Sequence, residues 1–177
     1  MIRFHTFDIC PLLKAFLDTE VHALCETLND YDIMENRDLP MEFWTRCREG
    51  GFFGMIIPKR YGGKGFSAHA HSQVLLKIAT RSGSASATVS VPNSLGPGEI
   101  LLRYGTDEQK DKYLPQLASG KLLPCFALTS PHSGSDAASM HEADGVVVRT
   151  ENGELAIRAS FNKRYITLAP VAVREEV

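Results

Sequence analysis

A change of pattern near residue 121 constrains the fold of this chain more than any other feature of the sequence. Up to Gly120, apolar residues recur at steps of three and four, which is the spacing of amphipathic helices. After Gly120, short apolar runs typical of β-strands follow, and the pair Asn152-Gly153 between two of them is a strong hairpin signal. These runs are Leu122–Thr129, Gly145–Thr150 and Leu155–Arg158. The sequence therefore predicts an α+β chain, with an all-helical domain at 1–120 and a partial β domain at 121–177.

Five stretches of the first part carry the helical pattern. They are Asp8–Asn29, Leu39–Gly50, Ser67–Arg81, Glu99–Tyr104 and Thr106–Gly120. Thr106 and Gln109 have the spacing of a helix N-cap with its reciprocal partner, and Gly120 is suited to end the helix that they begin. We expect a break from Asn29 to Tyr31, a loop at Tyr61–Gly65 and a turn-rich segment at Pro92–Gly98.

The stretch Ser82–Ser90 consists almost entirely of small residues, Gly, Ser, Ala and Thr. One interpretation is a flexible linker, because such compositions form random coils. The other is a helix whose side chains are small because another backbone or a ligand lies against it. We favour the helix.

Charge and composition exclude several classes of protein. Nineteen basic and 21 acidic side chains leave a formal net charge of -2, so a broad cationic surface for nucleic acid is not expected. No apolar run reaches the roughly 20 residues that cross a bilayer, and Met1–Ile9 lacks the apolar stretch of a secretory signal. We expect a cytoplasmic protein and leave peripheral contact with the inner membrane open.

The four cysteines are Cys10, Cys25, Cys47 and Cys125. They are widely spaced, with no Cys-x-x-Cys pair and no histidine partner nearby, which argues against a zinc site and against a disulfide framework. We expect reduced core thiols and no metal.

The segment Cys125–Ala137 is the most informative for chemistry. We read it as a strand that ends at Thr129, a turn at Pro131, and a loop that exposes Ser133, Gly134 and Ser135. Hydroxyls and backbone N–H groups in such a loop suit a flat polar ligand or an anion. An ordinary surface turn, in which Ser and Asp bond their own backbone, is the alternative.

Three segments in order resemble signatures of the acyl-CoA dehydrogenase family. Phe126–Asp136 is similar to the signature in which an aromatic residue, two apolar residues and Thr lead to Glu-Pro and then to Gly-Ser-Asp. Ile57–Gly63 resembles the family's Pro-x-x-Tyr-Gly-Gly segment, and Gly105–Pro115 resembles its Gly-Thr-Glu-Glu-Gln-Lys and Tyr-Leu-Pro. Phe161–Pro170 then looks like the second flavin-contacting strand. Its Asn-Lys-Arg-Tyr-Ile-Thr form is most similar to the large bacterial enzymes of fatty-acid β-oxidation.

The resemblance implies a fold and a reaction. The β domain is expected to be the start of an antiparallel β-barrel-like middle domain, and the family's carboxy-terminal helical domain is absent from this sequence. The implied function is flavin-dependent α,β-dehydrogenation of fatty acyl-CoA to trans-2-enoyl-CoA. The implied cofactor is FAD, the implied partner is electron-transfer flavoprotein or a similar acceptor, and the complete protein is expected to be a homo-oligomer.

The same resemblance implies which residues bind the flavin and the acyl-CoA. The expected flavin-binding residues are Phe126, Ala127, Leu128, Thr129, Gly134, Ser135, Tyr165, Ile166 and Thr167. Thr129 would hydrogen-bond the ring, and Ser135 would also lie near the acyl-CoA. Tyr165 offers an aromatic face for stacking and Thr167 a hydroxyl, and such contacts tune a flavin. A pair of sheet residues without a ligand is the alternative for Tyr165.

The sequence also departs from the family pattern. Ser130 stands where the family usually has Glu, and His132-Ser133 replaces a pair of small residues, so we assign His132 no catalytic role. The catalytic glutamate of the family is expected beyond Val177, so this chain alone is expected to be an inactive fragment. Three further functions stay open: a non-catalytic remnant that binds acyl-CoA or a partner, a purely structural helical module, and a related flavin oxygenase or oxidase on the same scaffold.

Overall fold

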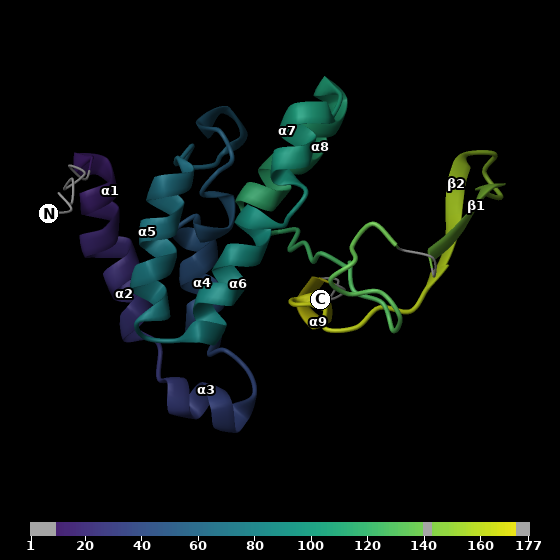
Figure 1. Ribbon diagram of the computed structural model, residues 1–177. Coiled ribbons are helices and arrows are strands. Elements are labelled where there is room, and N and C mark those ends of the chain that lie inside the picture. Colours follow the sequence, from purple (N-terminus) through teal and green to yellow (C-terminus); the bar gives the residue numbers. More distant parts are fainter. Residues whose placement is uncertain (1–9, 140–142, 173–177) are drawn as a thin grey trace, which may run out of the picture. The chain divides into compact units, whose positions relative to one another are not determined.

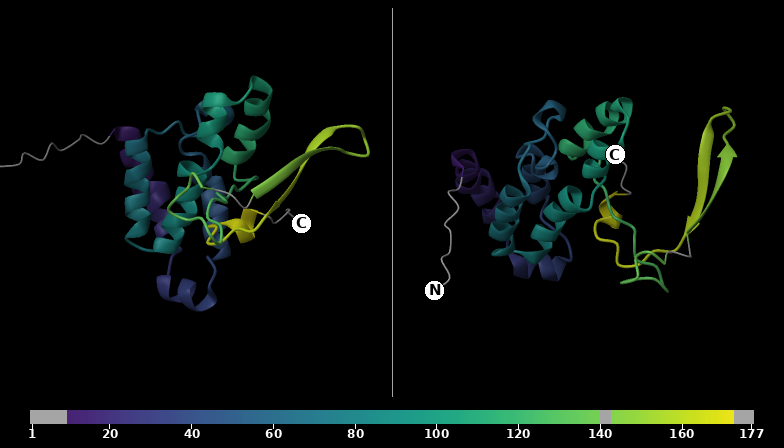
Figure 2. Two further views of the ribbon diagram at one scale, coloured as in Figure 1. Left: turned by 45° about the vertical axis from the view of Figure 1, so that its right-hand side comes forward. Right: turned by 45° about the horizontal axis from the view of Figure 1, so that its top comes forward.

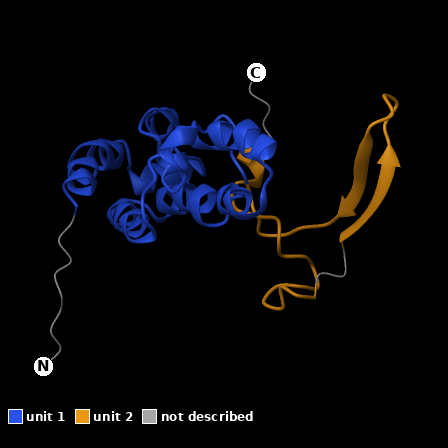
Figure 3. Ribbon diagram, turned by 90° about the horizontal axis from the view of Figure 1, so that it is seen from above, with its two compact units in different colours: residues 1–124 blue, residues 125–177 orange. Residues whose placement is uncertain are grey.

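Residues 10–139 and 143–172 of the chain are described by the structure, a computed structural model. The chain divides into two units, Met1–Pro124 and Cys125–Val177, which Figure 3 shows in blue and orange. The first unit is helical. The second holds two antiparallel strands and one short helix.

The helical unit is a bundle whose elements are marked in Figure 1. In chain order they are α1 (Pro11–Phe16), a π-helical turn (Leu17–Val21), α2 (His22–Glu26), α3 (Asp30–Asn36), α4 (Met41–Glu49), 3-10 turns at Phe52–Gly54 and Lys59–Tyr61, α5 (Ala68–Ala79), α6 (Gly83–Ser94), α7 (Gly98–Tyr104) and α8 (Asp107–Ala118). The described part of the predicted first helix, whose start at Asp8 lies outside the described residues, is the continuous run of α1, the π-helical turn and α2.

The core of the helical unit is built from the predicted apolar stripes. Leu24, Phe43, Phe53, Val74 and Ile78 are all fully buried, and they come from α2, α4, the turn after α4 and α5. The helices pack against one another through these stripes, because each helix carries its apolar side chains on one face. The predicted helices of this unit are therefore confirmed, with small differences at their ends.

The small-residue stretch forms α6, which confirms the helix and excludes the linker. Ala85 and Val89 are fully buried, and the Ser86 hydroxyl donates a hydrogen bond to the main-chain oxygen of Leu75 on α5, at 3.1 Å. Figure 1 shows α5 and α6 side by side. Small side chains are needed here because they let the backbones of two helices approach closely.

Two local predictions in the helical unit were right only in part, because the break and the turn are shorter than expected. Where a break was expected, Asn29 caps α3 by accepting a hydrogen bond from the N–H of Tyr31, and Ile33 anchors this helix in the core. Where a turn was expected, α6 continues through Pro92 to Ser94. Burial of Pro92 and of Asn93 holds the last turn of this helix together, although a proline cannot donate a backbone hydrogen bond.

The glycines of the Tyr61–Gly65 loop let its backbone lie close to the backbone of Gly54 and Ile57. The N–H groups of Lys64 and Gly65 donate to the main-chain oxygens of Gly54 and Ile57, at 3.0 and 2.9 Å. A Cβ added to Gly63 would lie 2.0 Å from the main-chain oxygen of Ile57, so no other residue fits without displacing the chain. The loop is therefore a structural part of the helical unit.

The second unit contains the predicted hairpin, which Figure 2 shows as a twisted ribbon. β1 (Ala143–Arg149) pairs antiparallel with β2 (Leu155–Phe161), with Val147 opposite Ile157. Gly153 has φ +80°, and its N–H donates to the main-chain oxygen of Thr150 at 2.9 Å, which confirms the turn around Asn152-Gly153. A short helix, α9 (Ala169–Ala172), follows.

The predicted strand at Leu122–Thr129 does not form. This segment has irregular backbone, and Pro124 lacks the N–H that a strand interior needs. Within the described ranges, the ladder hydrogen bonds of the second unit join only β1 and β2. An apolar run without a neighbouring strand has no partner for its backbone groups, so sequence pattern alone was not enough to make it a strand.

None of the helices in the described ranges combines the length and the apolar content needed to cross a bilayer.

Candidate functional site

The two segments that were predicted to line a flavin meet inside the second unit. The N–H of Arg164 donates to the main-chain oxygen of Thr129 at 2.9 Å, across a sequence separation of 35 residues. Thr129 is half-buried and Arg164 is exposed. The segments Cys125–Ser135 and Phe161–Thr167 are thus neighbours, as the predicted flavin wall requires.

Lys163 adds a second connection between these segments. Its ammonium group donates to the main-chain oxygen of Leu128 and to the Oγ atom of Ser130, each at 3.0 Å. Both acceptors flank Thr129. Lys163 was not predicted from the sequence, because a lysine in an exposed polar stretch is usually a solvated surface residue.

The loop after Thr129 is closed by its own hydrogen bonds. Ser130 and Ser133 exchange backbone hydrogen bonds, with the N–H of Ser130 donating at 2.7 Å and the N–H of Ser133 donating at 3.3 Å. The Ser133 hydroxyl donates to the main-chain oxygen of Asp136 at 3.0 Å. Ser130 and Ser133 are buried, so they hold the turn and leave the following residues, Gly134 and Ser135, exposed.

Tyr165 lies in a bend, which corrects the prediction of a strand at this position. Its φ is +58°, in the left-handed region, and a residue with this backbone cannot continue a strand. A turn at Thr167-Leu168 then leads into α9. Tyr165 is 89% exposed.

The remaining predicted residues divide by exposure. Leu128 and Ile166 are half-buried, whereas Phe126, Ala127 and Thr167 are exposed. Two exposed aromatic rings, Phe126 and Tyr165, therefore stand on adjoining segments, close to threonine and serine hydroxyls. Aromatic faces and hydroxyl donors are what a flavin ring with polar edges needs, so the residues present fit this cofactor.

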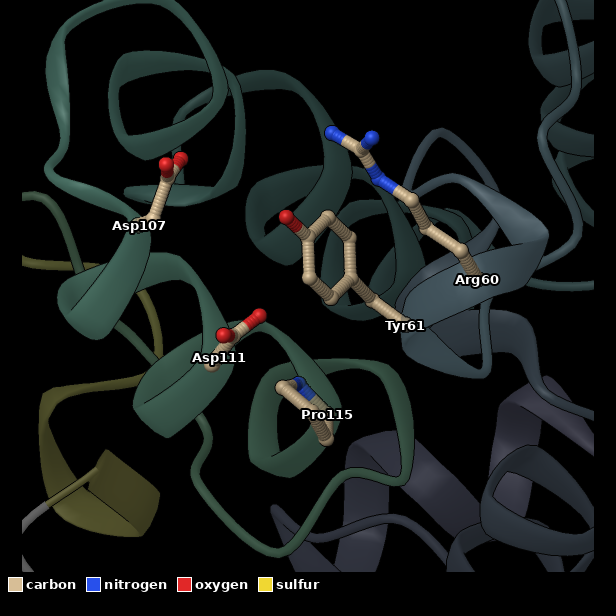
Figure 4. Close-up of a pocket in the computed structure, with 5 residues that line it drawn as sticks. All are labelled: Arg60, Tyr61, Asp107, Asp111 and Pro115. Carbon is tan, nitrogen blue, oxygen red and sulfur yellow. The ribbon is translucent and has the colours of Figure 1, made fainter.

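A separate pocket lies in the helical unit, between the Lys59–Tyr61 turn and α8. Its volume is ≈ 510 Å³, and Figure 4 shows Arg60 and Tyr61 on one side and Asp107 and Asp111 on the other. The guanidinium carbon of Arg60 lies 4.7 Å from the centre of the Tyr61 ring, a cation–π contact. Asp107 also pairs with Lys110 at 3.7 Å. These groups stabilise one another at the surface and bring no reactive pair together.

A further pocket of ≈ 370 Å³ on α7 and α8 has an apolar lining. Its residues are Pro97, Leu101, Tyr113, Leu117, Leu122, Leu123 and Pro124.

The cysteines are free thiols. Cys25 and Cys47 lie in the core, Cys10 is exposed and Cys125 is half-buried. Burial raises the pKa of the Cys47 thiol above its ordinary value, so this thiol is not a nucleophile at neutral pH. Among residues 10–139 and 143–172, no group of three His, Cys, Asp or Glu side chains is arranged to hold a metal ion.

Comparison with known proteins identifies the family. Residues 10–121 match the family model described as acyl-CoA dehydrogenase, N-terminal domain. The 3-(aryl)acrylate reductase of Clostridium sporogenes is 34% identical over 164 residues, which are 93% of this chain and 40% of that protein. The caffeyl-CoA reductase-Etf complex subunit CarC of Acetobacterium woodii is 36% identical over 140 residues, 79% of this chain and 35% of that protein.

Solved structures agree with the sequence relatives. An acyl-CoA dehydrogenase from Geobacillus kaustophilus has a TM-score of 0.74 and 25% identity, covering 93% of this chain and 42% of that one. An FAD complex of PigA has a TM-score of 0.72 and 25% identity, covering 94% of this chain and 43% of that one. The fold is thus the amino-terminal helical part of an acyl-CoA dehydrogenase followed by two antiparallel strands.

The chain belongs to the acyl-CoA dehydrogenase family. It spans 40% and 35% of the lengths of the two curated relatives named above.

Proposed function

We propose that this chain forms part of the flavin site of an FAD-dependent acyl-CoA dehydrogenase that acts on fatty acyl-CoA in β-oxidation. The observation that carries the proposal is the hydrogen bond between Arg164 and Thr129, which makes neighbours of the two segments expected to contact the cofactor. Family membership supports the class of reaction.

The proposed roles follow from the position of each side chain. The exposed rings of Phe126 and Tyr165 stack on the flavin and exclude water from it. Thr129 and Thr167 offer hydroxyls to the polar edge of the ring, and Ser135 offers its hydroxyl to the flavin and to the acyl-CoA. Ala127, Leu128, Gly134 and Ile166 complete the wall around them.

FAD, when bound, supplies the two-electron acceptor for the hydride that leaves the β-carbon of the acyl-CoA, while the α-proton passes to a base. No residue of the described ranges is assigned as that base. The chain's own residues hold the cofactor and the thioester in place, and this positioning is a large part of the rate in such reactions. Activity is therefore proposed for the whole protein.

A second candidate is reduction of an unsaturated acyl-CoA, the same chemistry in the opposite direction. Two relatives favour it, since one is a 3-(aryl)acrylate reductase and the other a caffeyl-CoA reductase subunit. The name of the second relative includes an Etf complex, and we propose electron-transfer flavoprotein as the redox partner of this protein too.

The two candidates are distinguished by expressing the whole reading frame and following the visible absorbance of bound flavin without oxygen. Loss of this absorbance on adding saturated acyl-CoAs of several chain lengths supports the dehydrogenase. Recovery of the absorbance only when unsaturated or aryl-substituted acyl-CoAs meet the reduced protein supports the reductase. A protein that holds no FAD at any concentration contradicts both.

Substitution of Tyr165 tests the stacking role. Tyr165→Gly should weaken FAD binding by roughly tenfold, because the ring contact is lost. The same change relieves the left-handed backbone, so a loss of affinity is not explained by strain. Tyr165→Phe keeps the ring and should bind FAD as the unchanged protein does. Equal affinity of all three proteins, measured by flavin fluorescence titration, would rule out stacking on Tyr165.

A further inference from the structure

The side chain of Lys163 joins the two flavin-facing segments of the second unit. The ammonium group reaches back over a sequence separation of 35 residues to the main-chain oxygen of Leu128, at 3.0 Å. It donates to the Oγ atom of Ser130 at the same distance. Lys163 is half-buried, so these charge-assisted hydrogen bonds are only partly screened by water.

We infer that Lys163 is a positioning residue that orients Thr129 toward the flavin by holding the residues on both sides of it. We call Lys163 with its two acceptors, the oxygen of Leu128 and the Oγ of Ser130, the Lys163 clamp. The inference rests on the proposed function for the part that concerns the flavin.

The clamp and the backbone act on consecutive residues. Lys163 binds Leu128 and Ser130, and the N–H of its neighbour Arg164 binds the main-chain oxygen of Thr129 at 2.9 Å. Residues 128 to 130 are thus each held by the segment that carries Tyr165. These hydrogen bonds hold the backbone of residues 128 to 130 in one place, so they fix the Cα–Cβ bond from which the Thr129 hydroxyl extends.

The Ser130 hydroxyl can serve as an acceptor for Lys163 because Ser130 is buried in a closed turn. Ser130 is 4% exposed, and its N–H is already used by the oxygen of Ser133 at 2.7 Å. Its Oγ is therefore a fixed acceptor at the base of a closed turn. A lysine suits this pair of acceptors because an ammonium group carries three donors at tetrahedral angles, whereas the planar fork of an arginine does not match a carbonyl and a hydroxyl in the same way.

The test measures the full chain without flavin first. Lys163→Met keeps the length of the side chain and removes the ammonium group. It should speed hydrogen exchange at the N–H groups of Ser130 and Arg164 by at least about tenfold, the factor expected when hydrogen bonds to a charged group are lost. Exchange at the N–H of Gly153, in the hairpin turn, should stay unchanged. Lys121→Met, at an exposed lysine of the helical unit, is the matched control and should change none of them.

Flavin binding by the whole protein is the second readout. Lys163→Met should weaken FAD binding at least about tenfold and shift the visible band of whatever flavin is bound, because Thr129 no longer meets the ring at one angle. Lys163→Arg keeps the charge and should restore part of the affinity. Ser130→Ala removes one acceptor and leaves the other, so its loss should be smaller than that of Lys163→Met.

Two outcomes overturn the inference. Unchanged exchange at Ser130 and Arg164 in Lys163→Met would show that no clamp exists. Faster exchange with unchanged FAD affinity and an unchanged flavin band would show that Lys163 stabilises the loop without positioning Thr129. A whole protein of unchanged sequence that binds no FAD contradicts the proposed function instead, and the exchange rates then decide the clamp alone.

Discussion

At the scale of single residues, the side chain of Asn93 makes three hydrogen bonds to main-chain groups. It is 3% exposed and lies in the last turn of α6. Its amide nitrogen donates to the main-chain oxygens of Phe52 and Val89, at 2.8 and 2.9 Å, and its oxygen accepts from the N–H of Ile56 at 3.4 Å. One side chain thus satisfies buried backbone groups of the Phe52–Ile56 segment, which has no sheet or long helix to do so.

Asn93→Ala should lower the free energy of unfolding by about 3 kcal/mol, because it leaves buried backbone groups without partners. Urea unfolding followed by the fluorescence of Trp44, the only tryptophan in the sequence and a residue of α4, measures this change. Asn36→Ala, at an exposed asparagine of α3, is the control and should cost much less. A loss for Asn93→Ala no larger than for the control would show that these hydrogen bonds contribute little.

His71 is a second buried polar residue, and its position affects stability through pH. It lies on α5, and its Nε2 atom is buried without a hydrogen-bond partner among the described residues. Burial lowers the pKa of His71 below its ordinary value. The folded chain therefore keeps this imidazole neutral when the unfolded chain takes up a proton.

Stability should fall as the pH drops below about 6.5, the pKa of an unfolded histidine, and should level off once the lower folded pKa is passed. Above pH 6.5 this residue contributes no dependence, since both states are then neutral. His71→Leu should flatten the pH dependence of urea unfolding in that range. An identical slope in His71→Leu and the wild type would show that the pKa of His71 is the same in the folded and the unfolded chain.

At the level of elements, α8 shows how far a local signal carries. Thr106 and Gln109 form the predicted capping box: the Thr106 hydroxyl accepts from the N–H of Gln109 at 3.2 Å, and Gln109 accepts from the N–H of Thr106 at 2.9 Å. Both hydrogen bonds join residues at the start of α8, only three positions apart in the chain. A capping box needs no distant partner, so it can be predicted from the sequence.

Thr106→Ala should reduce the free energy of unfolding by about 1 kcal/mol, through loss of the cap on α8. Thr106→Ser keeps the hydroxyl and should keep most of the stability. Thermal unfolding followed by circular dichroism compares the two substitutions with the wild type. Equal destabilisation by both would mean that the methyl group of Thr106, and not its hydroxyl, matters.

Elements that depend on distant partners were predicted less well. The helix α3 was not predicted because its sequence looks like a break between helices. Burial of Ile33 in the core stabilises this helix. The strands expected at Leu122–Thr129 and around Tyr165–Thr167 are irregular, since strands form only where another strand is paired with them. β1 and β2 were predicted because their partner is next in the chain.

For the whole molecule, the hairpin presents an apolar face. Val147 and Ile157 are opposite each other and are 68% and 72% exposed, and Leu155 and Phe161 lie on the same face. The other face carries Arg158 opposite Val146. Exposed apolar side chains on a two-stranded sheet with open edges favour association between chains.

The chain should therefore self-associate, and Ile157→Lys should reduce this association by placing a charge on the apolar face. Val146→Lys adds the same charge to the opposite face and should have a smaller effect. Sedimentation velocity at several protein concentrations measures both. A wild-type chain that sediments as one monomeric species at all concentrations would contradict this prediction.

The sequence by itself determined most helices of the first unit, the hairpin and its turn, and the family to which the chain belongs. These features depend on periodicity, on caps such as Thr106 and on turn residues such as Gly153, all of which act between near neighbours in the chain. Only the tertiary structure decided that α3 is a helix, that Tyr165 turns outward with a left-handed backbone, and that Lys163 binds the residues on both sides of Thr129. The physical reason is that burial and hydrogen bonds between residues far apart in the chain carry no signal in any short stretch of sequence.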